Sequence, residues 1–284
     1  MADTKMRGHI KSGLPPAKLL TEERRRAILE ILSRQGRVVI SDLSRHFGVS
    51  AVTARADITA LHERDLLVRS HGGAIRKQDV SVDYPLDIKE SQHHDEKVLI
   101  GHAAAGMVRE GQTVLLDSGT TTLEVARSIR SRQLPRLTVV TNSLTIAWEL
   151  STSPTTNLIM IGGILRHISR SFAGPQAQKL LYDLRVDHFF LGVDGLDPEM
   201  GPSTPDILEA ELNAAMIRSA SETTVVADSS KIVRRSLSLI APVTSVHRII
   251  TDEGISRGHR EILESKGIDV MVVPVRSGAA LQAG

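Results

Sequence analysis

The sequence predicts an α/β protein with two parts, an N-terminal winged helix-turn-helix and a larger C-terminal α/β domain with a mainly parallel sheet. Three observations predict this fold. Residues 21–76 contain three short amphipathic stretches followed by two extended runs that glycines separate. From residue 95 onward, short apolar runs alternate with amphipathic stretches. The charge also divides, since residues 1–78 carry 15 basic and 8 acidic side chains, whereas residues 79–284 carry 20 and 25.

Composition excludes several classes of protein. The 284 residues include no cysteine, which excludes a disulfide framework, a thiol nucleophile and a Cys-ligated metal site. No apolar run approaches the roughly 18 residues that cross a bilayer, and residues 1–20 hold no apolar signal segment. We therefore expect a cytoplasmic protein with no membrane partner. Aromatic residues make up only 2% of the chain, which argues against single-stranded nucleic acid as a ligand.

The N-terminal elements are predicted from caps and glycines. Residues 1–20, with two adjacent prolines, are expected to form a disordered arm. A helix should begin at Thr21, which supplies a capping hydroxyl, and end before Gly36. A second, shorter helix should begin at Ser41 and end at Gly48.

A third helix, capped by Ser50, should place Ala54, Ile58 and Leu61 on one face. Residues 66–70 and 74–76 then flank a His-Gly-Gly turn and predict a β-hairpin, which completes the winged module at residues 21–76. The polar residues 77–94 that follow are expected to be a linker.

The rest of the chain predicts a sheet of parallel strands covered by helices on both faces. We expect this domain at residues 95–274 and a tail at 275–284. The amphipathic stretch that contains Trp148 should be a helix with this tryptophan in the core. The expected strands are 113–117, 137–141, 158–162, 188–193, 223–228, 247–251 and 269–273.

The N-terminal module predicts a surface for double-stranded DNA. In a helix-turn-helix the second helix enters the major groove, and here Arg55 lies where it can reach guanine or a phosphate. The alternative is a helical bundle for protein contacts with solvated arginines, but the wing and the net charge of +7 favour DNA. The candidate DNA-binding residues are Arg24, Arg25, Arg37, Ser41, Ser50, Ala51, Val52, Thr53, Arg55, Arg69, His71 and Gly72. One module covers only a few base pairs, so we expect a homodimer or homotetramer on paired half-sites.

The same segments resemble a known family. RRRAIL, ISDLSRHFGVS, VTARADI and LVRSHGGAI are similar to the N-terminal domain of the DeoR family of bacterial transcription regulators. The chain departs from the family pattern at Ala54, where a bulkier aliphatic residue is usual, at Ala56, often basic, and at Asp65, commonly glycine. The resemblance implies a regulator that binds operator DNA, with the bases it contacts left open.

The junction after residues 113–117 predicts an anion site. Residues 117–122 (DSGTTT) bring backbone N–H groups and hydroxyls to a helix N-terminus, which favours bound anions, although an ordinary polar helix cap has the same composition. Polar residues also follow four other strands, at 141–143, at 162–166, at 194–195 and at 228–231. Because ligands bind at the carboxyl ends of parallel strands, these residues are expected to converge on one crevice.

These C-terminal segments also resemble the effector domain of the DeoR family, which is related in fold to ribose-5-phosphate isomerase and glucosamine-6-phosphate deaminase. LDSGTTT, VVTNS, GGILR, FLGVDG and VVADSSK carry the resemblance, and the run from GVDG to ADSSK is most similar to repressors of amino-sugar (N-acetylgalactosamine) catabolism. The resemblance implies a phosphorylated sugar as effector, which releases the protein from DNA. The candidate effector-binding residues are Asp117, Ser118, Gly119, Thr120, Thr121, Thr122, Asn142, Gly163, Arg166, Asp194, Glu209 and Lys231.

The alternative is a sugar-phosphate isomerase or deaminase with an accessory DNA-binding domain. The deaminases carry His directly after their Asp-Gly, where this chain has Leu196, and the isomerases carry Asp at the position of Leu191. We therefore expect binding without turnover, and no enzyme activity. No cofactor and no metal are expected, because the adjacent pair His93-His94 cannot share one helix face.

Overall fold

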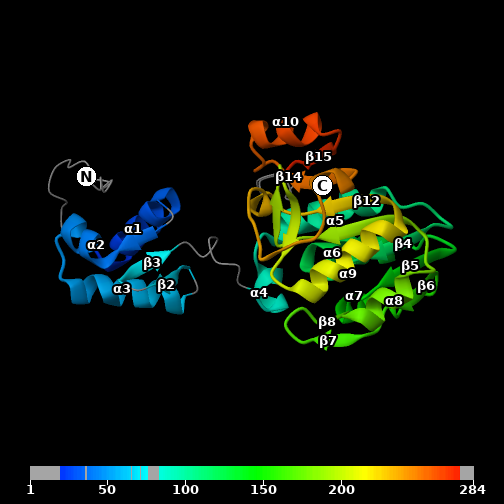
Figure 1. The fold of residues 1–284 in the computed structure, drawn as a ribbon, viewed down its shortest axis with the longest axis horizontal. Helices are drawn as coiled ribbons and strands as arrows, with labels where there is room; N and C mark the ends of the chain where they lie inside the picture. Colours follow the sequence, from blue (N-terminus) through cyan, green and yellow to red (C-terminus); the bar gives the residue numbers. More distant parts are fainter. Residues whose placement is uncertain (1–19, 36, 65, 71, 76–82, 276–284) are drawn as a thin grey trace, which may run out of the picture. The chain divides into compact units, whose positions relative to one another are not determined.

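The computed structural model describes residues 20–35, 37–64, 66–70, 72–75 and 83–275. The chain divides into two compact units, Met1–Val80 and Ser81–Gly284, each described below by itself (Figure 1). The expected arm, apart from Leu20, and the expected tail, apart from Val275, lie outside the described residues.

The first unit contains three helices and a small antiparallel sheet. Its elements are α1 Thr21–Gln35, β1 Arg37–Val39, α2 Ile40–Phe47, α3 Ala51–Glu63, β2 Val68–Ser70 and β3 Gly73–Ile75. The strand order is β1-β3-β2, with Val38 of β1 opposite Ala74 of β3. The predicted helices and hairpin are confirmed. The sequence analysis missed β1, a three-residue strand that adds a third member to the wing.

Local contacts explain the boundaries of these elements. Gly48 ends α2 with φ 62°, a left-handed conformation that glycine adopts without strain. Ser50 caps α3, since its side chain accepts a hydrogen bond from the Thr53 backbone N–H at 3.1 Å. A Cβ on Gly73 would lie 1.9 Å from the Val38 carbonyl oxygen, so β1 and β3 can pair this closely only with glycine there.

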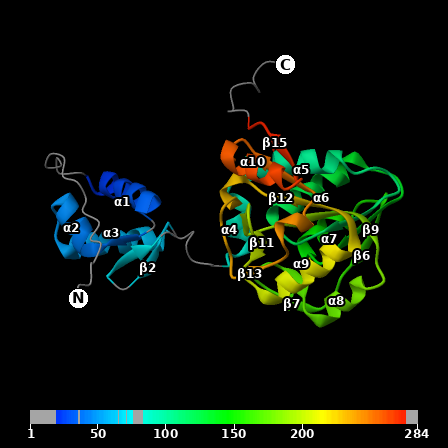
Figure 2. The same cartoon turned by 45° about the horizontal axis from the view of Figure 1, so that its top comes forward.

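The second unit is a sheet between two layers of helices (Figures 1 and 2). Its helices are α4 Leu86–Ser91, α5 His94–Gly106, α6 Thr120–Arg132, α7 Leu144–Leu150, α8 Pro175–Leu181, α9 Ile207–Ser219 and α10 Arg257–Ser265. Its strands are β4 Thr113–Leu116, β5 Leu137–Thr141, β6 Thr156–Met160, β7 Ile164–Arg166, β8 Ser171–Ala173, β9 Val186–Gly192, β10 Gly195–Asp197, β11 Gly201–Thr204, β12 Ala220–Val226, β13 Ser238–Leu239, β14 Arg248–Asp252 and β15 Asp269–Val273.

Seven of these strands pair in parallel in the order β15-β14-β12-β9-β4-β5-β6. They are the seven strands that the sequence predicts. One apolar core contains side chains of α5, α6 and α7, and the other contains side chains of α8, α9 and α10, so both faces of the sheet are buried. The predicted α/β fold with a parallel sheet is confirmed.

The expected linker at 77–94 needs correction over its second half. Residues 83–94 belong to the second unit, where α4 forms and α5 begins at His94. Leu86 is buried, and its backbone N–H donates to the Ile168 carbonyl at 3.1 Å. The sequence did not indicate α4, because this helix has no long apolar stripe. Ion pairs to the rest of the unit hold it instead.

The expected burial of Trp148 is wrong. This side chain is 82% exposed on α7. Ile146 and Leu150 are the residues of that helix with almost no exposed surface. The face of α7 that packs on the sheet is therefore the one opposite to our prediction.

Candidate functional site

The outward face of α3 is the candidate DNA-binding surface. Ser50, Ala51, Val52 and Arg55 are exposed, and Val52 reaches 72%. Ala54 and Ile58 point into the core of the unit, as predicted. The helix therefore offers one long basic side chain among small and apolar ones, which allows close approach to base edges and thymine methyl groups.

The other candidate DNA-binding residues are distributed around this helix. Ser41, Arg69 and Gly72 are exposed. Thr53 is engaged in the cap, because its hydroxyl lies 2.9 Å from that of Ser50. The side chain of Arg37 and all of His71 lie outside the described residues.

Two of the candidate DNA-binding residues, Arg24 and Arg25, form ion pairs within the first unit. Arg24 is only 8% exposed, and its Nε donates to the buried Asp57 carboxylate at 2.6 Å. Arg25 donates to the other oxygen of Asp57 at 3.1 Å and to Glu22 at 2.8 Å. These arginines join α1 to α3, so we remove Arg24 from the DNA-contacting set and assign Arg25 mainly to this joint.

A pocket in the second unit lies where the strand order reverses. The chain runs from β4 to β5 on one side of the sheet, and the later strand β9 pairs with the other side of β4. In parallel sheets ligands bind outside the carboxyl ends of two such strands. The pocket lies against residues 118–121 after β4 and residues 192–194 at the end of β9, and it encloses about 550 Å³, including space open to solvent.

Seven predicted effector residues line this pocket: Ser118, Gly119, Thr120, Thr121, Asp194, Glu209 and Lys231. The sequence analysis missed the remaining lining residues, Tyr84, Leu86, Lys89, Lys97, Ser169, Gly192 and Val193. Tyr84, Leu86 and Lys89 come from the segment that was taken for a linker. No local signal in the sequence distinguishes them, since only the fold brings residues 84–89 to the sheet edge.

Three lysines face the pocket beside the N-terminus of α6. Burial lowers the pKa of Lys231, with Asp228 and Asp194 opposing the shift. Burial also lowers the pKa of Lys97 to about 8. Burial disfavours the charged form of Lys89 as well, but its ion pair with Asp194 at 2.7 Å outweighs this and raises the pKa of Lys89. Cations beside the N-terminus of α6 suit this part of the pocket to an anion such as phosphate.

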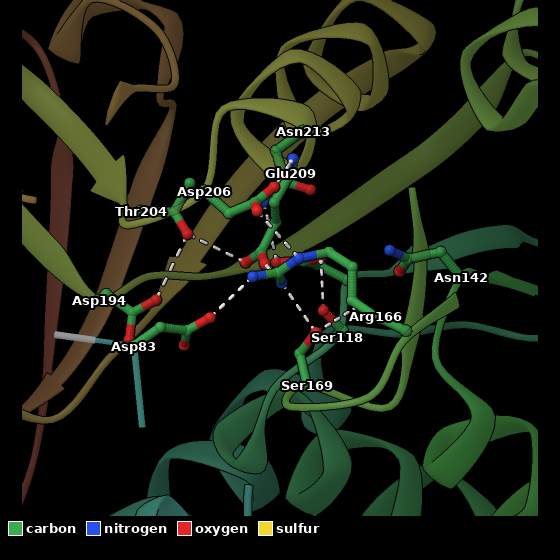
Figure 3. A network of polar contacts seen from close by, with 12 residues as sticks. Asp83, Ser118, Asn142, Arg166, Ser169, Asp194, Thr204, Asp206, Glu209 and Asn213 are labelled. Atoms are coloured by element: carbon green, nitrogen blue, oxygen red, sulfur yellow. Dashed lines mark hydrogen bonds and ion pairs between the residues drawn. The ribbon is translucent and has the colours of Figure 1, made fainter. Parts of the chain in front are cut away.

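Acidic groups of the pocket belong to a network of polar contacts around Glu209 and Arg166 (Figure 3). Glu209 is buried on α9, and burial together with the charge of Asp194 raises its pKa to about 7. Arg166 pairs with Glu209, with Asp83 at 2.7 Å and with Asp206 at 3.2 Å. The Thr204 hydroxyl lies 3.1 Å from Glu209 Oε1 and 3.4 Å from Asp194. Arg166 is therefore neutralised by carboxylates and supports the pocket from behind Glu209.

The five remaining candidates do not line the pocket. Asp117 has no exposed surface, accepts a hydrogen bond from Asn213 at 3.2 Å, and has its pKa raised well above the usual range by burial and by Glu209. Thr122 is also fully buried, and its hydroxyl donates to the Gly119 carbonyl at 3.0 Å. Both residues shape the 118–121 loop from beneath.

Asn142 and Gly163 have close contacts within the protein and do not line the pocket. The buried Asn142 amide donates to the Phe172 carbonyl at 3.0 Å, and Figure 3 shows it apart from the network around Glu209. Gly163 has φ 156°, and a Cβ there would lie 2.6 Å from the Ala173 carbonyl oxygen. Both residues hold the β7–β8 hairpin against the sheet. They, together with Arg166, therefore have structural contacts that account for their positions.

The described residues contain no group of three or more His, Asp or Glu side chains placed to hold a metal ion. Across the same ranges, no helix combines the length and the apolar character needed to span a bilayer.

The two units define a class of protein in which a helix-turn-helix domain is joined to a ligand-sensing α/β domain. The family models identify it: residues 24–80 match the DeoR-like helix-turn-helix domain, and residues 92–253 match the DeoR C terminal sensor domain. The chain therefore belongs to the DeoR family, as its sequence motifs indicated.

Curated relatives share most of the chain's length. The "Putative aga operon transcriptional repressor" of Escherichia coli O157:H7 is 39% identical over 89% of this chain and 94% of its own length. The transcriptional repressor AccR of Agrobacterium fabrum is 38% identical, over 82% and 90%. The glycerol-3-phosphate regulon repressor of Escherichia coli K12 is 30% identical, over 81% and 90%.

Among solved structures, ribose 5-phosphate isomerase A of Methanocaldococcus jannaschii is similar over 50% of this chain and 56% of its own, with 18% identity and a TM-score of 0.38. At that level the likeness carries nothing about activity.

Proposed function

We propose that this protein is a sequence-specific DNA-binding repressor of a sugar or amino-sugar catabolic operon, and that a phosphorylated sugar in the pocket of the second unit relieves repression. It acts in the cytoplasm as a homodimer or homotetramer on double-stranded operator DNA. The named relatives are repressors, which supports regulation over catalysis for this chain.

One observation carries the effector proposal: a pocket at the switch point of the sheet is lined by lysines, carboxylates and the hydroxyls of the 118–121 loop. The 118–121 loop and Lys231 suit a phosphate group. Asp194, Glu209 and the hydroxyls of the loop suit the polar groups of a sugar. A phosphorylated sugar presents both chemistries in one small molecule.

A thermal-shift panel of phosphorylated sugars tests this proposal. A ligand at about 100 times its Kd stabilises by about 2.7 kcal/mol, which raises Tm by roughly 5–10 °C for a domain of this size. Lys231→Met should abolish the shift, and Lys179→Met, which removes an exposed lysine on α8 outside the pocket, should retain it. A panel with no shift, or an equal shift in both variants, would contradict the assignment of the pocket.

The DNA-binding proposal needs an operator, which selection from random duplexes with the full-length chain can supply. Arg55→Ala should weaken binding to the selected duplex by about 1–3 kcal/mol, because Arg55 is the exposed cation of α3. Arg257→Ala removes one positive charge from an exposed site on α10 and is the matched control. Equal affinity of the Arg55→Ala and Arg257→Ala variants would remove α3 from the recognition surface.

A further inference from the structure

Residues 83–91 are the first described residues of the second unit. Only residues 76–82 separate them from the last described residue of the first unit, Ile75. In the second unit this segment, which contains α4, supplies Tyr84, Leu86 and Lys89 to the pocket lining. The part of the sensor that is closest in sequence to the DNA-binding unit is therefore also part of the pocket wall.

Two ion pairs join this segment to the polar network around Glu209, one to Asp194 and one to Arg166. Lys89 Nζ lies 2.7 Å from Asp194 and 3.3 Å from Asp83, and Asp83 lies 2.7 Å from Arg166. An ammonium group has three N–H donors, and the two carboxylates are the contacts of Lys89 Nζ among the described residues. Lys89 can therefore donate to an anion in the pocket while it keeps both carboxylates.

A second lysine connects the pocket to the C-terminal end of α4. Lys97 lines the pocket from α5, and its ammonium donates to the backbone carbonyls of Lys89 and Gln92. These carbonyls lie in the last turn and at the C-cap of α4, where a cation is favourable. An anion in the pocket favours the charged form of Lys97 and so strengthens its hydrogen bonds to α4.

The rest of the attachment is weak enough to be reversible. On the side away from the pocket, α4 is held by Asp87–Arg170 at 2.8 Å and Glu90–Arg127 at 3.2 Å, both partly exposed pairs of small individual worth. Leu86 is its buried apolar side chain. A six-residue helix does not persist in water by itself, so α4 exists as a helix only while docked.

We propose that residues 83–91 form a latch whose docking and the binding of an anion in the pocket stabilise each other. The inference rests on the proposed function, since it requires that the pocket bind an anion. A docked latch completes the pocket with Lys89, and an anion holds Lys89 and Lys97 in the positions that keep α4 docked. When α4 is released, residues 83–93 join the segment that connects the two units, so the length of that connecting segment increases. By linkage, the state of the pocket then biases operator binding.

Hydrogen exchange of the full-length chain tests the latch, with inorganic phosphate as the probe. If phosphate binds only when α4 is docked, phosphate at ten times its Kd multiplies the docked-to-released ratio by about 11, so the amides of 86–91 should exchange up to about 11-fold more slowly. The variant Asp87→Asn with Glu90→Gln loosens α4 without changing a pocket residue. It should exchange faster at 86–91 and bind phosphate several-fold more weakly. Glu261→Gln, which breaks an exposed pair on α10, is the matched control and should match the parent protein.

The outcomes separate the latch from the anion site. Protection of both 118–121 and 86–91 by phosphate supports the latch. Protection of 118–121 alone keeps the anion site and overturns the latch. Protection of neither segment overturns both, because the proposed anion site itself has then failed.

Discussion

Removal of the Asp57 carboxylate should strongly destabilise the first unit. Asp57 is 2% exposed on α3, and it joins that helix to α1 through Arg24 at 2.6 Å and Arg25 at 3.1 Å. Asp57→Ala takes away a carboxylate that pairs with Arg24, and the side chains of both residues are largely buried. Asp57 therefore contributes, together with the apolar core that α1 and α3 share, to the orientation of the proposed recognition helix.

The size of the effect follows from the burial of the pair. Loss of one partner of a buried ion pair costs about 3–5 kcal/mol. The span of the first unit that the structure describes, residues 20–75, corresponds to a total stability of roughly 3–8 kcal/mol. Asp57→Ala should therefore remove most of the free energy of unfolding of the first unit and abolish DNA binding with it, although Asp57 is too buried to touch DNA.

The change in the free energy of unfolding can be measured by unfolding the full-length chain in urea, with hydrogen exchange of the α3 amides as the probe of the first unit. The control is Asp42→Ala, which breaks a 3.5 Å pair with the exposed Arg45 and should cost less than about 1 kcal/mol. Replacement of the pair by apolar residues, Arg24→Met with Asp57→Leu, should recover much of the stability lost in Asp57→Ala. Similar stabilities for Asp57→Ala and Asp42→Ala would refute the reasoning.

Three further changes have expected outcomes. Sulfate, which is a dianion throughout pH 6–9, should bind more weakly as pH rises. Glu209 gains negative charge above its pKa of about 7, and Lys97 loses positive charge above its pKa of about 8. Calorimetry should show that the affinity for sulfate falls by up to tenfold per pH unit above pH 8. An affinity independent of pH would exclude both groups from the anion site. Arg55→Ala should also reduce the salt dependence of operator binding by about one counterion in a titration with salt. Gly101→Ala should lower Tm, because its Cβ would lie 2.6 Å from the α6 backbone, whereas Gly106→Ala on the same helix meets nothing within 4 Å and should not lower it.

The sequence predicted the parallel sheet because each buried strand has a recognisable composition. Runs such as 137–141 and 269–273 are apolar, β-branched and short, and helical stretches separate them. The short antiparallel pairs β7–β8 and β10–β11 were missed, since three- or four-residue strands carry too few side chains to show a period. Helix α4 was missed for a related reason, because much of its attachment consists of ion pairs to residues 37 to 105 positions away.

Part of the pocket was likewise predictable. Ser118 to Thr121 and Asp194 follow the ends of strands β4 and β9, and topology alone brings those ends together. Asn142 and Gly163 also follow strand ends, but β5 and β6 lie on the side of β4 away from the switch point, so their ends do not reach the pocket. Lys89 and Lys97 precede the first strand of the sheet, and no strand end indicates their place.

The raised pKa of Glu209 follows from its environment in the pocket. A carboxyl that titrates near pH 7 is in the range useful for proton transfer, but a general base also needs a free oxygen within hydrogen-bond reach of the substrate. Here Oε2 is held by Arg166 and Oε1 accepts from the Thr204 hydroxyl at 3.1 Å. Glu209 is thus fixed by its neighbours, and its raised pKa reflects burial beside Asp194. What this arrangement provides is a pocket whose charge changes with proton and anion binding.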